Sequence, residues 1–196
     1  MAHAKCAHES YFLVGEAWRL QKSVQDILPK WSDNMPYYGY LLGMGAFGLE
    51  EVGEYAEAEK MGRRAAEIEP RDGWAVHAVA HVMQMQGRCD ENIEWLESTV
   101  DDWRDAVWLS GHLWWHLCLP LLEKEQFDRV FDIYDARMAT CDEDMVTRLM
   151  DCTSMLWRLE EFGLDVGDRW EPLADKWLRH ADEHAIAFTD AHFAMT

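Results

Sequence analysis

Apolar side chains recur every three to four residues along most of this chain, with polar side chains between them. This spacing places the apolar residues on one face of an α-helix. No stretch shows the sustained apolar–polar alternation, rich in β-branched residues, that is typical of a half-buried strand. Glycines and prolines stand between the periodic segments and mark turns. The pattern therefore predicts an all-α protein built from antiparallel helix pairs.

The helical segments repeat at an interval of about 34 residues, because Gly53 and Gly87 open equivalent turns. Small residues for close helix packing, a turn and a terminal proline at this interval are typical of tetratricopeptide repeats. The positions that match this pattern in the first unit are Gly53, Tyr55, Ala58, Ala65 and Pro70. Three units are expected, at about 38–72, 73–106 and 107–140.

Two further helix pairs are expected to flank the three units, at 7–30 and 144–190. Their longest helices are predicted at 7–22, 144–162 and 170–189, and Pro120 is expected to bend the helix that contains it. Stacked pairs of this kind form a right-handed α-solenoid with an extended concave surface. We therefore expect one tetratricopeptide-like domain over 1–196.

Two His-x-x-x-His pairs occupy equivalent positions in the second and third units. His77 and His81 form the first pair, and His112 and His116 follow at a step of 35 residues. Residues four apart share a helix face, about 6 Å from one another. The first helix of each tetratricopeptide pair lines the concave surface, so all four imidazoles are expected to face the groove. Imidazole is a common ligand of zinc, copper and iron, and the four histidines are therefore candidate ligands of a transition metal.

Two interpretations of these histidines stay open. In the structural one, the imidazoles bond to Trp N–H groups and backbone carbonyls inside a helix interface. In the functional one, they form a metal or catalytic site, although Ala78 and Leu113 stand where a HExxH zinc protease needs its glutamate. Candidate supplementary ligands are Glu50, Glu51, His8, Asp190 and His192.

Aromatic residues accompany the histidines, since Trp108, His112 and Trp115 follow one another on a single helix face. The functional interpretation is an aromatic-walled pocket for a small or cationic ligand. The structural alternative is a repeat core filled with large side chains. The aromatic candidates for the groove are Trp74, Trp108, Trp115 and Tyr40.

The charge balance narrows the class of partner. The chain carries 37 acidic and 18 basic residues, a net charge of −19, which argues against nucleic acid and anionic membranes. The acidic excess favours solubility, a cationic partner such as a basic peptide, or a salt-adapted host. Neither a signal core nor a spanning apolar run is present, and five cysteines without a CxxC pair favour a reducing compartment. The acidic segment 141–145 lacks the spacing of a calcium loop. We expect a cytoplasmic protein, with no cofactor predicted other than the metal.

Several longer motifs resemble the tetratricopeptide repeat protein 38 family. They are YGYLLGMGAFGLEEVGEYAEAE, WAVHAVAHVMQMQGR, GHLWWHLCL, DIYDAR, MLWRLEEFG, VGDRWEPLAD and AFTDAH. The resemblance runs from about His8 to His192 and implies the fold more than an activity. Members of the family are usually longer, so the chain is expected to match their central part, as a short natural variant or a fragment.

These observations lead to three hypotheses about function. The first is a binding or scaffold module whose histidine- and tryptophan-lined groove takes a peptide or a small ligand. The second is an enzyme that uses the paired histidines, with or without a metal. The third is a structural fragment whose tail, AFTDAHFAMT, folds back onto the histidine helices. Terminal helices without polar caps also favour a homodimer.

Overall fold

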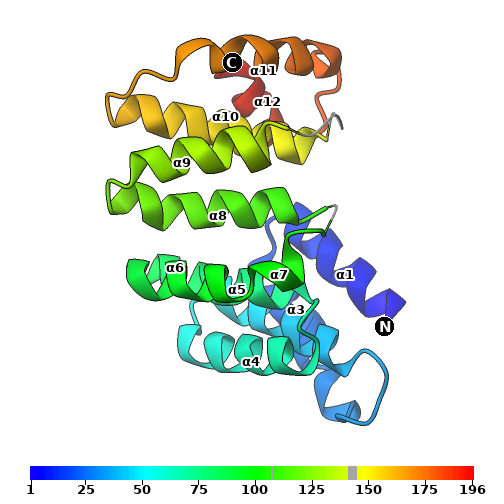
Figure 1. The fold of residues 1–196 in the computed structure, drawn as a ribbon. Coiled ribbons are helices and arrows are strands. Elements are labelled where there is room, and N and C mark those ends of the chain that lie inside the picture. The colour runs from blue at the N-terminus through cyan, green and yellow to red at the C-terminus, as the bar shows by residue number, and fades with distance from the viewer. Residues whose placement is uncertain (107, 141–144) are drawn as a thin grey trace. The chain divides into compact units, whose positions relative to one another are not determined.

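The computed structural model describes residues 1–106, 108–140 and 145–196 (Figure 1). Within these ranges the regular structure is helical and contains no strand, which confirms the all-α prediction. The chain divides into two compact units, Met1–Leu113 and Trp114–Thr196. The prediction of one domain over 1–196 stays a prediction, and each unit is described by itself.

Antiparallel helix pairs make up the first unit. Its helices are α1 (Ala2–Leu13), α2 (Ala17–Gln25), the 3-10 turn η1 (Leu28–Lys30), α3 (Tyr38–Glu50), α4 (Tyr55–Ile68), α5 (Gly73–Met85), α6 (Cys89–Ser98) and α7 (Val100–Trp103). Helix α3 packs against α2, α4 and α5, and α5 packs against α4 and α6. Helix α8 (Ser110–Glu123) begins in this unit and continues into the next.

The sequences of α3, α4 and α5 explain this packing. Helix α5 is apolar around most of its circumference, and Ala75, Val76, Ala78 and Val79 are fully buried. Helix α4 instead buries only a stripe of small residues, Ala58, Gly62 and Ala65, and keeps charged side chains on its outer face. Small side chains let helix backbones approach closely, so the first helices of the pairs become the buried layer of this unit.

The turns inside the pairs are alike. Gly53 and Gly87 adopt φ values of +82° and +68°, in the left-handed region that favours glycine, and the residue after each donates its N–H back to the preceding helix. This confirms the turns expected at these two glycines. The equivalent turn after α8 has Glu125, at φ +55°, and Gln126 donates to the carbonyl of Leu121. A glutamate therefore holds a position for which the repeat pattern favours glycine.

In the second unit, helices pack around α10. Its elements after α8 are α9 (Phe127–Ile133), the π-helical turn η2 (Tyr134–Met138), α10 (Val146–Glu161), the 3-10 turn η3 (Gly167–Arg169), α11 (Trp170–Trp177), the 3-10 turn η4 (Leu178–His180) and α12 (Ala187–Ala194). Helix α10 contacts η2, α11 and α12 (Figure 1). The indole N–H of Trp177 donates to Oγ1 of Thr153 at 2.8 Å, so the polar atom of this buried tryptophan is satisfied.

Several expected helices differ from the structure. The helix expected at 7–22 is two helices, α1 and α2, because Gly15 adopts φ +72° and ends the first of them. The helix expected at 170–189 is also interrupted, at His184, where φ is +38°. The helix expected at 144–162 is α10; its first expected residue, Asp144, lies outside the described residues, as do Val107 at the start of the third unit and the acidic segment 141–144.

Helix α8 continues through Pro120, where a bend was expected, and ends at Glu123. The tail helix α12 packs against α10, and its Phe193 ring lies 6.0 Å from the Trp177 ring. None of the helices in the described part of the chain combines the length and the apolar character that a bilayer crossing needs.

Candidate functional site

Three of the four predicted histidines meet in the first unit. Helix α5 supplies His77 and His81, one turn apart, and the first turn of α8 supplies His112. One ring nitrogen of each lies within 4.8 Å of one from each of the others. The ring centroid of His77 is 4.2 Å from that of His81 and 5.0 Å from that of His112. The structure therefore brings these three side chains together in one cluster.

Two carboxylates from the end of α3 adjoin this cluster. Oε2 of Glu50 lies 3.3 Å from Nδ1 of His81, and the Glu50 side chain is only 6% exposed. Glu51 offers an oxygen within 4.8 Å of ligand atoms of both Glu50 and His81. We call His77, His81, His112, Glu50 and Glu51 the histidine site.

The electrostatics of the histidine site favour a neutral imidazole at its centre. Burial lowers the pKa of His77 well below its usual value, and the neighbouring His81 and His112 lower it further. Burial raises the pKa of Glu51, the adjacent charge of Glu50 adds to the rise, and His81 opposes it. The site thus combines imidazole nitrogens with two carboxylates that repel each other, an arrangement that a cation would stabilise.

Aromatic rings surround these imidazoles. The Phe47 ring lies 5.5 Å from that of His77 and 5.8 Å from that of His81. The Trp74 ring meets His77 edge-on at 5.4 Å, and Trp74 is 46% exposed. The site therefore has a buried aromatic wall on α3 and a solvent-exposed tryptophan at the start of α5.

Two other aromatic candidates of the first unit lie elsewhere. Tyr40 is seven residues before Phe47, roughly 10 Å along α3. Burial raises the pKa of Tyr40, and the charges of Glu69 and Asp72 raise it further. Trp108 is 77% exposed in the segment before α8. Neither contributes a ring to the aromatic contacts of the histidine site described above.

The remaining candidates from α8 belong to the second unit. Nε1 of Trp115 donates to Oγ of Ser154 on α10 at 2.7 Å, and the Arg158 guanidinium lies over the Trp115 ring. These contacts support the packing interpretation for Trp115. The His116 side chain is buried, with its ring 4.9 Å from that of Trp115. Its membership of a four-histidine site stays a prediction.

The supplementary ligands suggested by the sequence differ in their surroundings. Glu50 and Glu51 adjoin His81, as described above. Nδ1 of His8 lies 3.4 Å from the hydroxyl oxygen of Ser23. Burial lowers the pKa of His8. Asp190 pairs with His184 at 3.2 Å in the second unit, and Nδ1 of His192 lies 2.8 Å from the Phe188 carbonyl.

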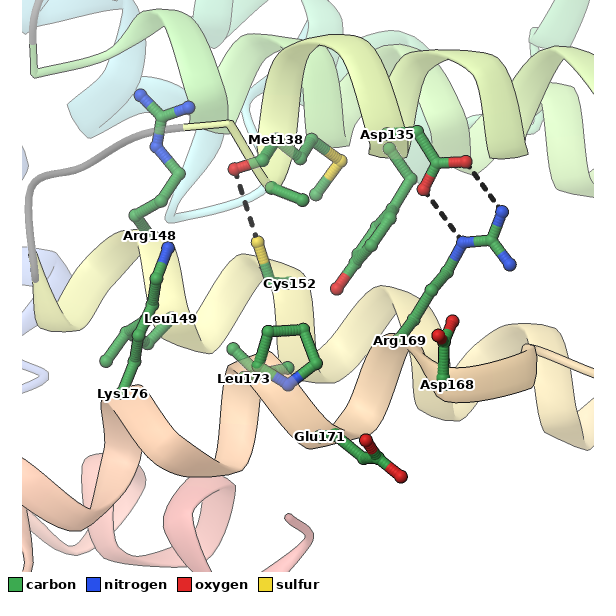
Figure 2. Close-up of a pocket in the computed structure, with 13 residues that line it drawn as sticks. Asp135, Met138, Arg148, Leu149, Cys152, Asp168, Arg169, Glu171, Leu173 and Lys176 are labelled. Atoms are coloured by element: carbon green, nitrogen blue, oxygen red, sulfur yellow. Dashed lines mark hydrogen bonds and ion pairs between the residues drawn. The ribbon is translucent and has the colours of Figure 1, made fainter.

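The second unit contains a cavity of about 230 Å³ that the sequence did not indicate (Figure 2). It lies among η2, α10 and α11. Arg169 forms two hydrogen bonds to Asp135, at 2.8 and 2.6 Å, and Sγ of Cys152 lies 3.5 Å from the Met138 carbonyl. Its lining residues are scattered over separate helices and form no motif, so sequence reasoning had no spacing by which to find it.

Sequence reasoning also missed Phe47, although a signal was present. With the 34-residue step between Gly53 and Gly87, Phe47 is the counterpart of His81, and Gly43 is the counterpart of His77. The repeat at 38–72 thus has a ring and a small residue where the repeat at 73–106 has imidazoles. Comparing equivalent repeat positions would have placed Phe47 beside the histidines.

No protein-family model matches the chain. Among solved structures, it is similar to a MamA RS-1 ArsTM double mutant, with a TM-score of 0.58, 12% identity and coverage of 93% of this chain and 96% of that one. It is also similar to a putative kinesin light chain from Podosopora anserina with nearly identical TPR-like repeats, with a TM-score of 0.60, 13% identity and coverage of 94% and 98%. These likenesses, together with the helix pairs, show a tetratricopeptide-like helical repeat fold, as the sequence predicted.

Proposed function

We propose that this protein is a binding module that takes a basic peptide at the histidine site and Trp74. The observation that carries the proposal is the burial of Glu50, 6% exposed, beside His81 and within a few ångströms of Glu51. Burying a carboxylate is costly unless it is paired, and the partner of Glu50 is the imidazole of His81, a side chain that can itself bind a ligand. We also propose kinship with the tetratricopeptide repeat protein 38 family, on the motifs quoted above.

Charge and exposure support a cationic ligand. The chain carries 37 acidic against 18 basic residues, which attracts a basic partner from a distance. The exposed Trp74 ring offers a face for a lysine or arginine side chain. Glu50 and Glu51 provide negative charge beside His81, which lies on the same helix, α5, as Trp74. A peptide that places one cationic side chain on the Trp74 ring and another near these carboxylates fits the chemistry of the site.

Calorimetric titration with Lys/Arg-rich peptides, beside acidic peptides of equal length, tests this function. Trp74→Ala is expected to weaken binding of the basic peptide at least tenfold. Trp157→Ala is the matched control, because Trp157 in the second unit is also 46% exposed. Equal binding of the acidic peptide, or equal loss in both variants, would contradict the proposal.

A second candidate function is an enzyme that uses the same histidines. The observation that favours it is the position of Glu51, whose carboxylate lies within 4.8 Å of a ring nitrogen of His81, as in a pair that shares proton transfer. Hydrolysis of activated esters that falls in Glu51→Gln, but not in Glu54→Gln on the same exposed turn, would support it. Equal rates of ester hydrolysis in the parent protein and in Glu51→Gln would exclude this candidate.

We also propose that the protein is cytoplasmic and forms a homodimer. Terminal helices α1 and α12 show no side-chain N-cap hydrogen bond, and Phe12 and Phe188 are exposed on them. Light scattering across a range of concentrations measures the oligomeric state, and a mass of 22.9 kDa throughout would identify a monomer.

A further inference from the structure

We propose that His77, His81 and His112 bind one divalent transition-metal ion, with Glu50 as the carboxylate that orients His81. The inference rests on the proposed function in assigning the histidine site to a ligand, but it requires no peptide. Its basis is geometric, since the three imidazoles come from two helices and present nitrogens within 4.8 Å of one another.

The spacing of the nitrogens suits a metal after a small contraction. A tetrahedral zinc ion binds imidazole nitrogen at about 2.0–2.1 Å, which places two ligand nitrogens roughly 3.3 Å apart. The separations here are at most 4.8 Å. Rotations of the imidazole side chains about χ1 and χ2 are enough to close a gap of this size. The helices need not move apart or change register.

Glu50 has the position of a partner that orients a metal-bound histidine. In metal sites, a histidine ligand almost always donates its second ring N–H to a carboxylate, a carbonyl or water. Nδ1 of His81 lies 3.3 Å from Oε2 of Glu50. We therefore assign Nδ1 as the nitrogen that faces Glu50, and Nε2 as the nitrogen that binds the metal.

The charges of the site also favour a cation. The two carboxylates, Glu50 and Glu51, stand side by side with one of them almost wholly buried, and a divalent ion would offset their mutual repulsion. Three imidazoles with a nearby carboxylate fit zinc, cobalt and copper better than the oxygen-seeking magnesium or calcium.

Ring packing alone accounts less well for this cluster. The hydrophobic contacts that Phe47 makes with His77 and His81 would be made equally well by leucine or phenylalanine. Imidazoles also bring polar nitrogens into the interface, and these need a hydrogen-bond partner or a bound ligand when they are buried. Their convergence with a buried carboxylate is what a metal site requires and what a core does not.

The test is a titration of the metal-free full chain with Zn²⁺, in competition with a chromophoric chelator, and with Co²⁺ followed by its visible absorption. We expect one ion per chain and the intense bands of tetrahedral cobalt. His81→Gln and His112→Gln are each expected to weaken zinc binding at least 100-fold. Glu50→Gln should weaken it 10- to 100-fold, as for other partners of metal-bound histidines.

His192→Gln is the matched control, because this histidine lies on α12 in the second unit. Far-ultraviolet circular dichroism of each variant checks folding, and a substitution at His81 should be tolerated because a quarter of its side chain is exposed. Zinc affinity that is unchanged in His81→Gln, or lost equally in His192→Gln, would overturn the proposal. So would the absence of zinc binding in the parent chain.

The same samples separate this inference from the proposed function. Basic-peptide binding is measured once in the presence of EDTA and once with zinc. Peptide binding without any zinc binding would overturn the metal site and leave the binding module standing. Zinc binding that depends on the three histidines, without peptide binding, would support the metal site and contradict the peptide proposal.

Discussion

Gly48 on α3 lies directly against the backbone of Gln21 on α2: a Cβ added to Gly48 would come within 2.8 Å of the Gln21 Cα. Backbone atoms of a packed helix cannot step aside as a flexible side chain can. Gly48→Ala is therefore expected to destabilise the protein by about 1–3 kcal/mol, even though alanine favours a helix over glycine. Urea unfolding measures the change.

Gly45 on the same helix provides the comparison. A Cβ there would meet the sulfur of Met61, at 2.7 Å, and a methionine side chain can rotate away. Gly45→Ala should thus change the free energy of unfolding by about 1 kcal/mol or less in either direction. A loss for Gly48→Ala as small as that for Gly45→Ala would show that the α2–α3 contact is looser than described.

Asp72 is expected to make stability depend on pH. Burial raises its pKa to about 7, the charge of Glu69 adds to the rise, and the N–H groups of Trp74 and Ala75 oppose it. A carboxyl whose pKa is higher in the folded state stabilises the fold when protonated. This contribution is full below the unfolded pKa near 3.8, and it is lost as pH rises to about 7.

The variant Asp72→Asn tests this dependence. Oδ1 of Asp72 accepts the Trp74 N–H at 3.2 Å as the N-cap of α5, and asparagine keeps that acceptor without the charge. The stability of the parent relative to the variant should fall by a few kcal/mol between pH 4 and pH 8, at about 1.4 kcal/mol per pKa unit. A difference that stays constant over this range would contradict the prediction.

Thr153 is expected to stabilise the second unit through its hydroxyl. Oγ1 accepts the Trp177 indole N–H at 2.8 Å, and both side chains are buried. Thr153→Val keeps the shape but leaves that N–H without its acceptor, at a cost of about 1–3 kcal/mol. Thr153→Ser keeps the hydroxyl and loses one methyl group, so thermal unfolding should show a smaller loss of about 1 kcal/mol. The reverse order would rule out the hydrogen bond as the main contribution.

Cysteine alkylation is expected to separate two classes of thiol. Cys6 is exposed and Cys89 partly so, whereas Cys118 and Cys152 are buried. Burial also raises the pKa of the Cys118 thiol, which lowers its thiolate fraction further. In a Cys141→Ser background, iodoacetamide should modify two thiols quickly in the folded protein and all four in urea. Rapid modification of Cys118 in the folded state would contradict its burial.

The helix pairs were predictable because local patterns encode them. The glycines at 53 and 87 adopt the left-handed turns that their spacing indicated. The third turn was harder to place, since Glu125 adopts a positive φ that its chemistry does not signal. Gly15 could have been recognised as a helix end, but the apolar periodicity continues across it and suggested one helix instead of two.

The histidine site was predictable only in part. The i,i+4 spacing placed His77 beside His81, because a helix fixes that distance. The approach of Glu50 depends on how α3 packs against α5, and no local pattern in either helix specifies that offset. A sequence thus reveals neighbours within one helix more reliably than neighbours across an interface.

The buried tryptophans give each unit its own optical signal. Trp103 in the first unit donates to Oγ1 of Thr99 at 3.1 Å, and Trp177 in the second donates to Thr153. Both indoles are almost fully shielded from water, so their emission should shift to the red when their own unit opens. Comparing the parent with Trp103→Phe and with Trp177→Phe isolates the two emissions. Coincident melting curves would show one cooperative unit, and separate curves would show two.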